Sequence, residues 1–214
     1  MTRSDITSWG LAAICLPLAA LVETGALLFP TNWSVLAVTA IIRFVQILII
    51  CLLIIILPGA SALAGFSTTN LIKGIQIGML VSVAFGLLAA TLGGVLYLLG
   101  FSPLNLVRGS IPYSGSSLVL FFVTGGIIGP VAEEIVFRAI IFRTLRPLGL
   151  SAAVLLSTII FALLHFHGNG FPLIQCAGGI IFALCFERSG HIVTPMIVHS
   201  AGNLALFSLA LFSS

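Results

Sequence analysis

The sequence predicts an all-α fold, a polytopic transmembrane helical bundle of about seven spans with a kinked fourth helix. Three observations predict it: 60% of the 214 residues are hydrophobic, only 6% are charged, and the mean hydropathy is +1.30. A soluble domain carries about a quarter charged residues, so this chain could not cover a surface that faces water. Because lipid offers the backbone no hydrogen-bond partner, helices are the expected way for it to cross a membrane.

Seven apolar runs approach the roughly 17–25 residues that a transmembrane helix needs. They are 9–29, 34–57, 70–100, 117–145, 150–166, 172–186 and 192–212. The connections between them are short, apart from a loop expected over 101–116. We predict a single integral membrane domain over residues 1–214, with N-terminal spans in 1–116 and a core that carries the chemical motifs in 117–214.

The first two runs each contain one charged residue at similar depth. Glu23 lies in 9–29 and Arg43 in 34–57, and we expect a structural ion pair between them. In the third run Gly74 and Gly78 lie one turn apart, and small residues at that spacing let two helices approach closely.

The fourth run is too long for one straight span. It contains Gly125, Gly126, Gly129 and Pro130 in close succession. Proline removes a backbone donor and disturbs the preceding turn of a helix. We therefore expect a break or kink before residue 133, with a new helix starting near Pro130.

The basic residues near the ends of the runs indicate the orientation. With seven spans, five fall on one side and Arg108 on the other; the five are Arg3, Lys73, Arg143, Arg146 and Arg188. Basic residues gather on the cytoplasmic side of membrane proteins, so the N-terminus is expected in the cytoplasm. A net charge of +3 is too small and too dispersed for nucleic acid as a partner. The lipid bilayer is the expected surrounding.

Two adjacent acids, Glu133 and Glu134, lie inside the fourth run. A charged group at that depth costs about 2.5–3.5 kcal/mol on insertion scales and therefore needs a reason. Arg138 follows Glu134 by one turn and can pair with it. Neighbouring helical positions differ by about 100° around the axis, so we expect that the two acids cannot share one partner. Glu133 is then a carboxylate without a local cation, which can act as a base.

Three polar residues on later runs are candidates to join Glu133. His165 closes the fifth run, and His199 and Asn203 lie one turn apart on the last. A helical rise of about 1.5 Å per residue puts all of them at depths compatible with one cavity in the middle or outer half of the bilayer. Such a set could activate water: Glu133 takes a proton, His165 orients the water, and His199 and Asn203 donate hydrogen bonds to an oxyanion.

Residues 133–138 (EEIVFR), 161–165 (FALLH) and 199–203 (HSAGN) resemble, in order, the three motifs of the CAAX protease and bacteriocin-processing family. This family of glutamic intramembrane proteases includes CAAX prenyl protease type 2-like and Abi proteins. The resemblance extends over about 125–207. The compact chain looks more like the prokaryotic members, which implies a multi-pass protein of the prokaryotic cell (inner) membrane.

The resemblance implies a glutamic-type intramembrane endopeptidase that uses no cofactor and no metal. Glu133 and His165 would activate water, and His199 and Asn203 would form the oxyanion site. Glu134 and Arg138 would support the site or orient substrate, although a purely structural ion pair is an equal alternative. The implied substrate is a membrane-anchored protein or peptide, with cleavage of a C-terminal tail as one form of the reaction.

Several alternatives remain open. A non-catalytic relative could act as a bacteriocin immunity or partner-binding membrane protein, and a small transporter could use Glu133 and the histidines as a proton relay. A zinc-dependent membrane protease could use Glu133, His165 and His199, since two histidines and a carboxylate form a common zinc set. A two-aspartate protease is excluded because the only aspartate is Asp5. A site-2-type metalloprotease is excluded because no His-Glu-x-x-His segment occurs.

Overall fold

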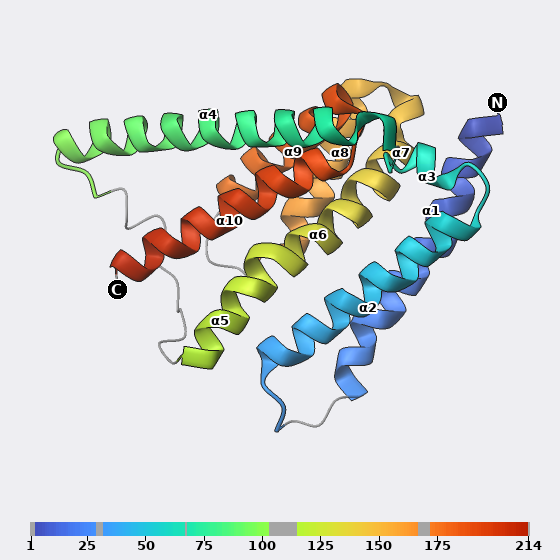
Figure 1. Ribbon diagram of the computed structural model, residues 1–214, viewed down its shortest axis with the longest axis horizontal. Coiled ribbons are helices and arrows are strands. Elements are labelled where there is room, and N and C mark those ends of the chain that lie inside the picture. The colour runs from blue at the N-terminus through green and yellow to red at the C-terminus, as the bar shows by residue number, and fades with distance from the viewer. Residues whose placement is uncertain (1–2, 29–31, 67, 103–114, 167–171, 214) are drawn as a thin grey trace.

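The computed structural model describes residues 3–28, 32–66, 68–102, 115–166 and 172–213, and the regular structure in these ranges is entirely helical. In chain order the α-helices are α1 (Arg3–Thr24), α2 (Val35–Ile56), α3 (Ala60–Leu63), α4 (Leu71–Leu98), α5 (Gly115–Val123), α6 (Gly129–Glu134), α7 (Arg143–Leu145), α8 (Leu150–Leu164), α9 (Leu173–Ser189) and α10 (Val193–Ser213). Short 3₁₀ turns occupy Gly25–Leu28, Thr68–Asn70 and Arg146–Leu148. The predicted all-α bundle is confirmed (Figure 1).

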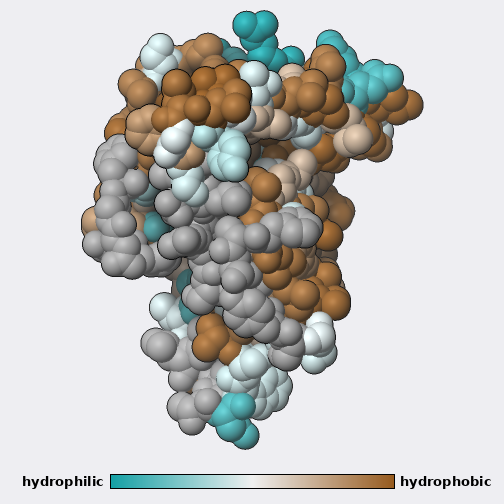
Figure 2. Space-filling view, turned by 90° about the vertical axis from the view of Figure 1, so that its left-hand side faces the viewer, coloured by the Kyte–Doolittle hydropathy of each residue, from teal (hydrophilic) through white to brown (hydrophobic). Residues whose placement is uncertain are grey.

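The chain is a multi-pass membrane protein, and each of the seven predicted runs is helical. Within the described residues, four helical stretches are long and apolar enough to cross a membrane: Val35–Ile56, Ala60–Leu98, Gly115–Leu148 and Val193–Leu211. Ser8–Thr24 and Leu150–Leu164 are shorter apolar helices. Figure 2 shows hydrophobic side chains across the upper part of one face and down its right-hand side, with the most hydrophilic ones mainly at its upper and lower ends.

The fourth run forms one continuous helical stretch, and the irregularity expected there takes the form of widened turns. α5, α6 and α7 follow one another through π-helical segments at Thr124–Ile128 and Ile135–Phe142. At the first of these, the Gly129 N–H donates to the carbonyl of Thr124, five residues earlier. Pro130 offers no N–H to the carbonyls before it. The helix therefore widens at this point and continues as α6.

The second π-helical segment passes through the middle of the hydrophobic core. Ala139, Ile140 and Phe142 on this segment are fully buried or nearly so, and they belong to one cluster with Cys15 of α1 and Phe186 of α9. The helix that carries Glu133 and Glu134 is thus surrounded by other helices. Tight packing of this kind holds side chains in defined rotamers.

α4 packs against α10 through its first turns and then diverges from it (Figure 1). A Cβ added at Gly74 would lie 3.0 Å from His191 Cβ, and one added at Gly78 would lie 3.1 Å from Ile197 Cβ. Such distances are tighter than ordinary contacts, so both glycines allow the close approach that the sequence predicted. Beyond Gly86, the residues of α4 are largely exposed within the protein.

α1 and α2 are joined by the expected ion pair. Arg43 Nη1 lies 2.8 Å from Glu23 Oε2, and the same nitrogen donates to Gln46 Oε1 at 2.8 Å. Gln46 Nε2 donates to Glu23 Oε2 and to the carbonyl of Ala19. Each polar group therefore has partners, and together they tie the two helices to each other.

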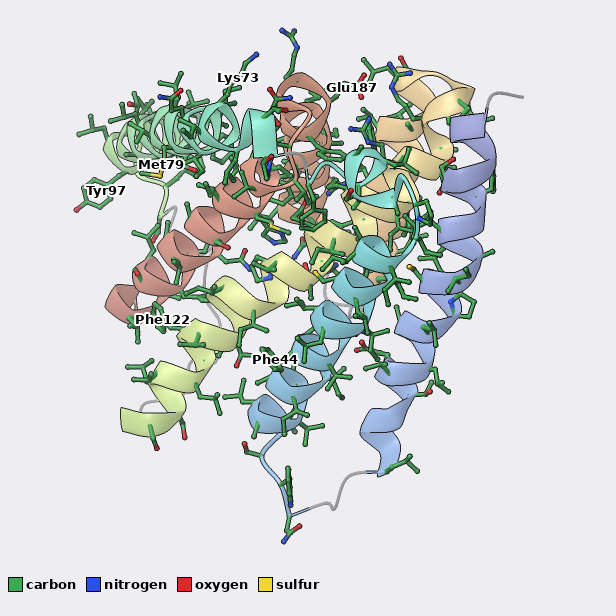
Figure 3. All side chains as sticks on the ribbon, turned by 45° about the vertical axis from the view of Figure 1, so that its right-hand side comes forward. Phe44, Lys73, Met79, Tyr97, Phe122 and Glu187 are labelled. Atoms are coloured by element: carbon green, nitrogen blue, oxygen red, sulfur yellow. The ribbon has the colours of Figure 1, made fainter. Side chains whose placement is uncertain are left out.

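One end of the bundle carries charged groups from several helices. Lys73 and Glu187 lie at the same end in Figure 3, and Arg146 donates from Nε and Nη2 to Glu187 Oε1 at 3.0 and 2.8 Å. Residues 103–114 of the expected loop, with Arg108, lie outside the described residues. The division of one domain at residue 116 stays a prediction.

Candidate active site

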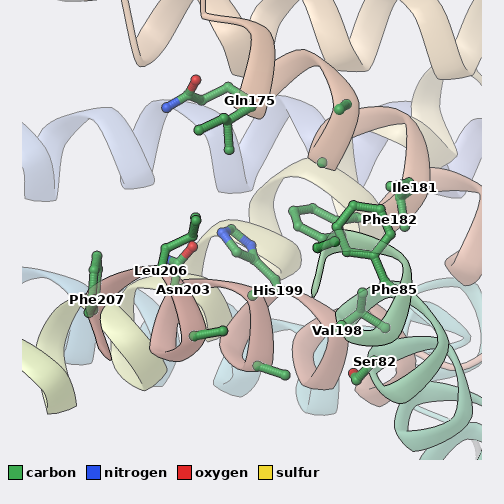
Figure 4. A pocket seen from close by; sticks show the side chains of 18 of the residues that line it. Ser82, Phe85, Gln175, Ile181, Phe182, Val198, His199, Asn203, Leu206 and Phe207 are labelled. Carbon is green, nitrogen blue, oxygen red and sulfur yellow. The ribbon is translucent and has the colours of Figure 1, made fainter. Parts of the chain in front are cut away.

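A cavity of about 730 Å³ lies where α4 diverges from α9 and α10, and Glu133, His165, His199 and Asn203 all line it. The structure thus brings together the four residues that the sequence singled out from three separate helical runs. His199 and Asn203 project from α10 beside Phe182 and Leu206, which belong to the apolar wall (Figure 4). The polar groups are therefore concentrated in an otherwise apolar chamber.

Glu133 faces two imidazoles. Its Oε2 lies 3.6 Å from His165 Nε2 and 3.8 Å from His199 Nε2. Among the described residues, these are the ion pairs that Glu133 makes within 4 Å. Both separations exceed the length of a direct hydrogen bond. Glu133 therefore has basic neighbours but no guanidinium or ammonium partner in that range.

Glu134 is fully buried and pairs with the equally buried Arg138, whose Nε donates to Glu134 Oε2 at 2.9 Å. This is the pair expected from their one-turn spacing. The guanidinium also lies 5.7 Å from the centre of the Phe161 ring and 5.9 Å from that of Phe182. The aromatic faces on either side favour the cation electrostatically.

The expectation that the two acids cannot share a partner is wrong. His199 Nδ1 lies 2.9 Å from Glu134 Oε1, while Nε2 of the same ring faces Glu133. A separation of about 100° around the helix prevents two side chains from sharing a partner that has only one binding atom. An imidazole has nitrogens on two sides of its ring, so a residue on another helix can bridge acids that point in different directions.

The remaining contacts of the two histidines determine which ring nitrogen carries hydrogen. Phe161 O lies 2.8 Å from His165 Nδ1, and a carbonyl oxygen only accepts, so Nδ1 donates. Glu134 is held ionised by Arg138, so His199 Nδ1 donates to it in the same way. In both rings it is therefore Nε2 that faces Glu133.

The end of α8 explains why the Phe161 carbonyl is free for this contact. The backbone N–H of His165 donates to the carbonyl of Ala162, three residues earlier, instead of to Phe161. Carbonyls in the last turn of a helix need partners outside the regular pattern, and the His165 side chain supplies one. Ring contacts add to the positioning: His165 lies 4.4 Å from Phe161, and His199 stacks on Phe182 at 4.4 Å.

Asn203 is oriented by the widened turn on the neighbouring helix. Its Nδ2 donates to the carbonyl of Gly125 at 2.8 Å. In a π-helical turn that carbonyl would bond to the N–H five residues later, which is the position of Pro130, where no N–H exists. The Asn203 amide replaces the missing donor, and its second N–H is left for the cavity. The Gly125–Pro130 spacing was visible in the sequence, but the link to Asn203 was not.

Ser157 is a further residue that the sequence did not indicate. It is fully buried on α8, and its hydroxyl lies 3.5 Å from Arg138 Nη1. Within the described residues, no group of three or more His, Cys, Asp or Glu side chains has an arrangement suited to a metal ion.

Comparisons with known proteins agree with the motifs. Residues 115–205 match the family described as Type II CAAX prenyl endopeptidase Rce1-like. The chain is 36% identical over 95 residues to the membrane-embedded CAAX protease MroQ of Staphylococcus aureus. This match covers 40% of this chain and 36% of the relative. It is 33% identical over 97 residues to the human CAAX prenyl protease 2, covering 36% of this chain and 30% of the relative.

The chain spans about a third of the length of these curated relatives, and no solved structure gives a significant match. The matched segment contains Glu133, His165, His199 and Asn203, which line the cavity, and Glu134, which contacts His199. Over residues 115–205, the chain is therefore similar to the Type II CAAX prenyl endopeptidase Rce1-like family.

Proposed function

We propose that this protein is a glutamic-type intramembrane endopeptidase in which Glu133 and His165 activate a water molecule. The observation that carries the proposal is the pairing of Glu133 Oε2 with His165 Nε2 at 3.6 Å. A polar separation of this size suits a bridging water. With hydrogen on His165 Nδ1, Nε2 accepts one water hydrogen and Glu133 accepts the other. The lone pairs of the water oxygen then point away from both groups, toward a substrate carbonyl.

The reaction follows from these donors and acceptors. The water oxygen bonds to the carbonyl carbon of the substrate as Glu133 takes the proton. Hydrogen bonds from His199 and Asn203 stabilise the oxyanion that forms. When the tetrahedral species collapses, the carbon–nitrogen bond breaks and the proton on Glu133 passes to the leaving amine. The products are a carboxylic acid and an amine, and the carboxylate of Glu133 is restored.

The cavity walls favour an apolar, membrane-anchored protein or peptide as substrate. The lining continues along α10 from His199 to Ala210 and includes Phe85 and Phe121. The eleven helical rises between these two residues correspond to about 16 Å, enough for about five extended residues. A C-terminal tail is one such segment. The names of two relatives, which contain the term CAAX, are consistent with a substrate of this kind.

The test compares the wild type with Glu133→Gln in proteoliposomes, using a farnesylated CAAX peptide and a single-span reporter with an apolar C-terminal tail as probes. We expect cleavage to fall by about 10²–10⁴-fold, the contribution of a general base. Glu187→Gln is the matched control, because Glu187 lies away from the cavity and pairs with Arg146. A stably inserted Glu133→Gln protein that still cleaves would refute the assignment.

The same preparation separates the alternatives. Zinc found in stoichiometric amount, with activity lost on chelation and restored by zinc, would favour the metal-dependent reaction. Proton-driven flux without any cleaved product would favour the transporter, and specific binding without either would favour a non-catalytic role.

We further propose that the N-terminus is cytoplasmic, in a prokaryotic cell membrane, because the charged end of the bundle carries Lys73 and Arg146. A thiol introduced at Lys73 should then react with an impermeant reagent only in inside-out vesicles.

A further inference from the structure

The wall of the cavity that α9 forms carries a polar side chain that the proposed reaction does not use. Gln175 lies in the first turn of α9 and is half-buried in the lining. In Figure 4 it lies across the cavity from His199 and Asn203 of α10. The other residues that α9 contributes to the lining are apolar or glycine, so this wall presents a carboxamide among groups that form no hydrogen bonds.

The carboxamide of Gln175 is not committed to the protein within the described ranges. Among the described residues of the lining, Ser82 and Gln175 are the polar ones besides the four proposed for catalysis. The Ser82 hydroxyl donates to the carbonyl of Gly78, one turn earlier on α4. No hydrogen bond between described residues involves the Gln175 side chain. An amide without a partner in an apolar wall is costly, so its presence requires an explanation.

A peptide that enters this cavity brings polar groups of its own. Each of its residues other than proline carries one N–H and one C=O, and burying these groups among apolar walls is unfavourable unless they find partners. In the proposed reaction the four catalytic side chains serve the water and the carbonyl under attack. The backbone groups of the neighbouring substrate residues therefore need another partner, and the α9 wall offers one.

We infer that Gln175 is a substrate-positioning residue that binds the main chain of an extended substrate segment. In an extended chain the N–H and C=O of one residue point to the same side, where a neighbouring strand exchanges two hydrogen bonds with them. Gln175 Oε1 can accept from that N–H while Nε2 donates to that C=O. The inference rests on the proposed function, because it specifies the form in which the substrate of that reaction is held.

This pairing distinguishes between forms of the substrate. A helical segment satisfies its backbone groups internally, and a prenyl chain has no such groups, so neither can use the amide. An extended segment can, because its N–H and C=O are free. Gln175 therefore favours a peptide that is unwound where it crosses the cavity, while the apolar lining accepts its side chains.

The first test removes the amide and keeps the length of the side chain. In Gln175→Met, KM for a synthetic peptide of the reporter's apolar tail should rise about 10-fold, the effect of losing one or two hydrogen bonds. The kcat should change by less than about twofold, because uniform binding is lost. Ser82→Ala is the matched control, since this hydroxyl bonds to its own helix. An unchanged KM in Gln175→Met, or an equal rise in Ser82→Ala, would overturn the inference.

A scan of ester analogues assigns the contact to the main chain. Each analogue replaces one peptide N–H, away from the cleaved bond, by oxygen and leaves every side chain unchanged. Binding is measured in nanodiscs on Glu133→Gln, in which cleavage is expected to be lost. We expect one position at which the ester weakens binding about 5–10-fold, and the same ester should cost nothing in Glu133→Gln/Gln175→Met. Equal ester costs in both proteins would overturn the inference, whereas cleavage by a stably inserted Glu133→Gln would overturn the proposed function instead.

Discussion

The membrane-embedded part of this protein contains two acidic clusters that differ in how completely their groups are paired. Between α1 and α2, Glu23 accepts hydrogen bonds from Arg43 and Gln46, and Gln46 also bonds to a backbone carbonyl. In the cavity, Glu133 faces two imidazoles at distances too long for direct hydrogen bonds. The first arrangement stabilises helix packing, and the second leaves a carboxylate available to exchange a proton.

Glu134 shows that one helix can carry, at neighbouring positions, an acid with direct hydrogen bonds and an acid without them. It is fully buried, with Arg138 on one oxygen and His199 on the other. An acid with direct hydrogen bonds to two partners therefore lies beside an acid whose basic neighbours are farther than a direct hydrogen bond. The helix supplies the separation, because the two side chains leave it in different directions, and His199 reconnects them from α10.

Among substitutions in these clusters, Arg138→Met is expected to have the largest effect, which is a loss of stability. Removing the guanidinium leaves the buried Glu134 without its cation, and breaking a buried pair by removing one partner costs about 3–5 kcal/mol. Unfolding in mixed micelles should show a loss of this size. The double variant Glu134→Gln/Arg138→Met should recover part of it, because no uncompensated charge remains; additive losses would show that the pair does not act as a unit.

A smaller effect, on rate, is expected from Asn203→Ala. The substitution removes the proposed oxyanion donor, and loss of such a donor costs about 10²–10³-fold in kcat. It also leaves the Gly125 carbonyl without its partner, at about 1–3 kcal/mol of stability. Steady-state cleavage and unfolding of the same preparation separate the two losses. Ser208→Ala serves as control, since Ser208 lies on the same helix and its hydroxyl donates to the carbonyl of Leu204; an equal drop in its kcat would contradict the role of Asn203.

The smallest effect is expected from Glu23→Gln, which disturbs the paired cluster. The glutamine amide oxygen can still accept from Arg43, and Gln46 Oε1 accepts from it as well, so Arg43 keeps neutral partners. The loss of stability should therefore be smaller than that of Arg138→Met, while kcat stays unchanged. A large loss of kcat with stability retained would mean that the α1–α2 cluster takes part in substrate handling, and the contrast between the two clusters would fail.

Much of the fold could be predicted from particular residues. Apolar runs bounded by short connections indicated the helices, and Gly74 and Gly78 indicated a close helix contact, although not that α10 is the partner. The glycines before Pro130 indicated an irregular turn, although not that it would widen into a π-helical segment and continue. Which of these outcomes occurs depends on whether other groups satisfy the freed carbonyls, and here Asn203 of α10 does so.

The sequence by itself determined that the chain crosses a membrane. It also identified Glu133, His165, His199 and Asn203 as polar residues whose presence at that depth requires an explanation. Hydropathy and helical spacing are local properties, so they can be read along the chain. Only the tertiary structure decided that His199 lies between Glu133 and Glu134, and that each histidine turns Nε2 toward Glu133. The rotation of α10 and the end of α8 relative to α6 sets these contacts, and that rotation arises from packing among helices far apart in the chain.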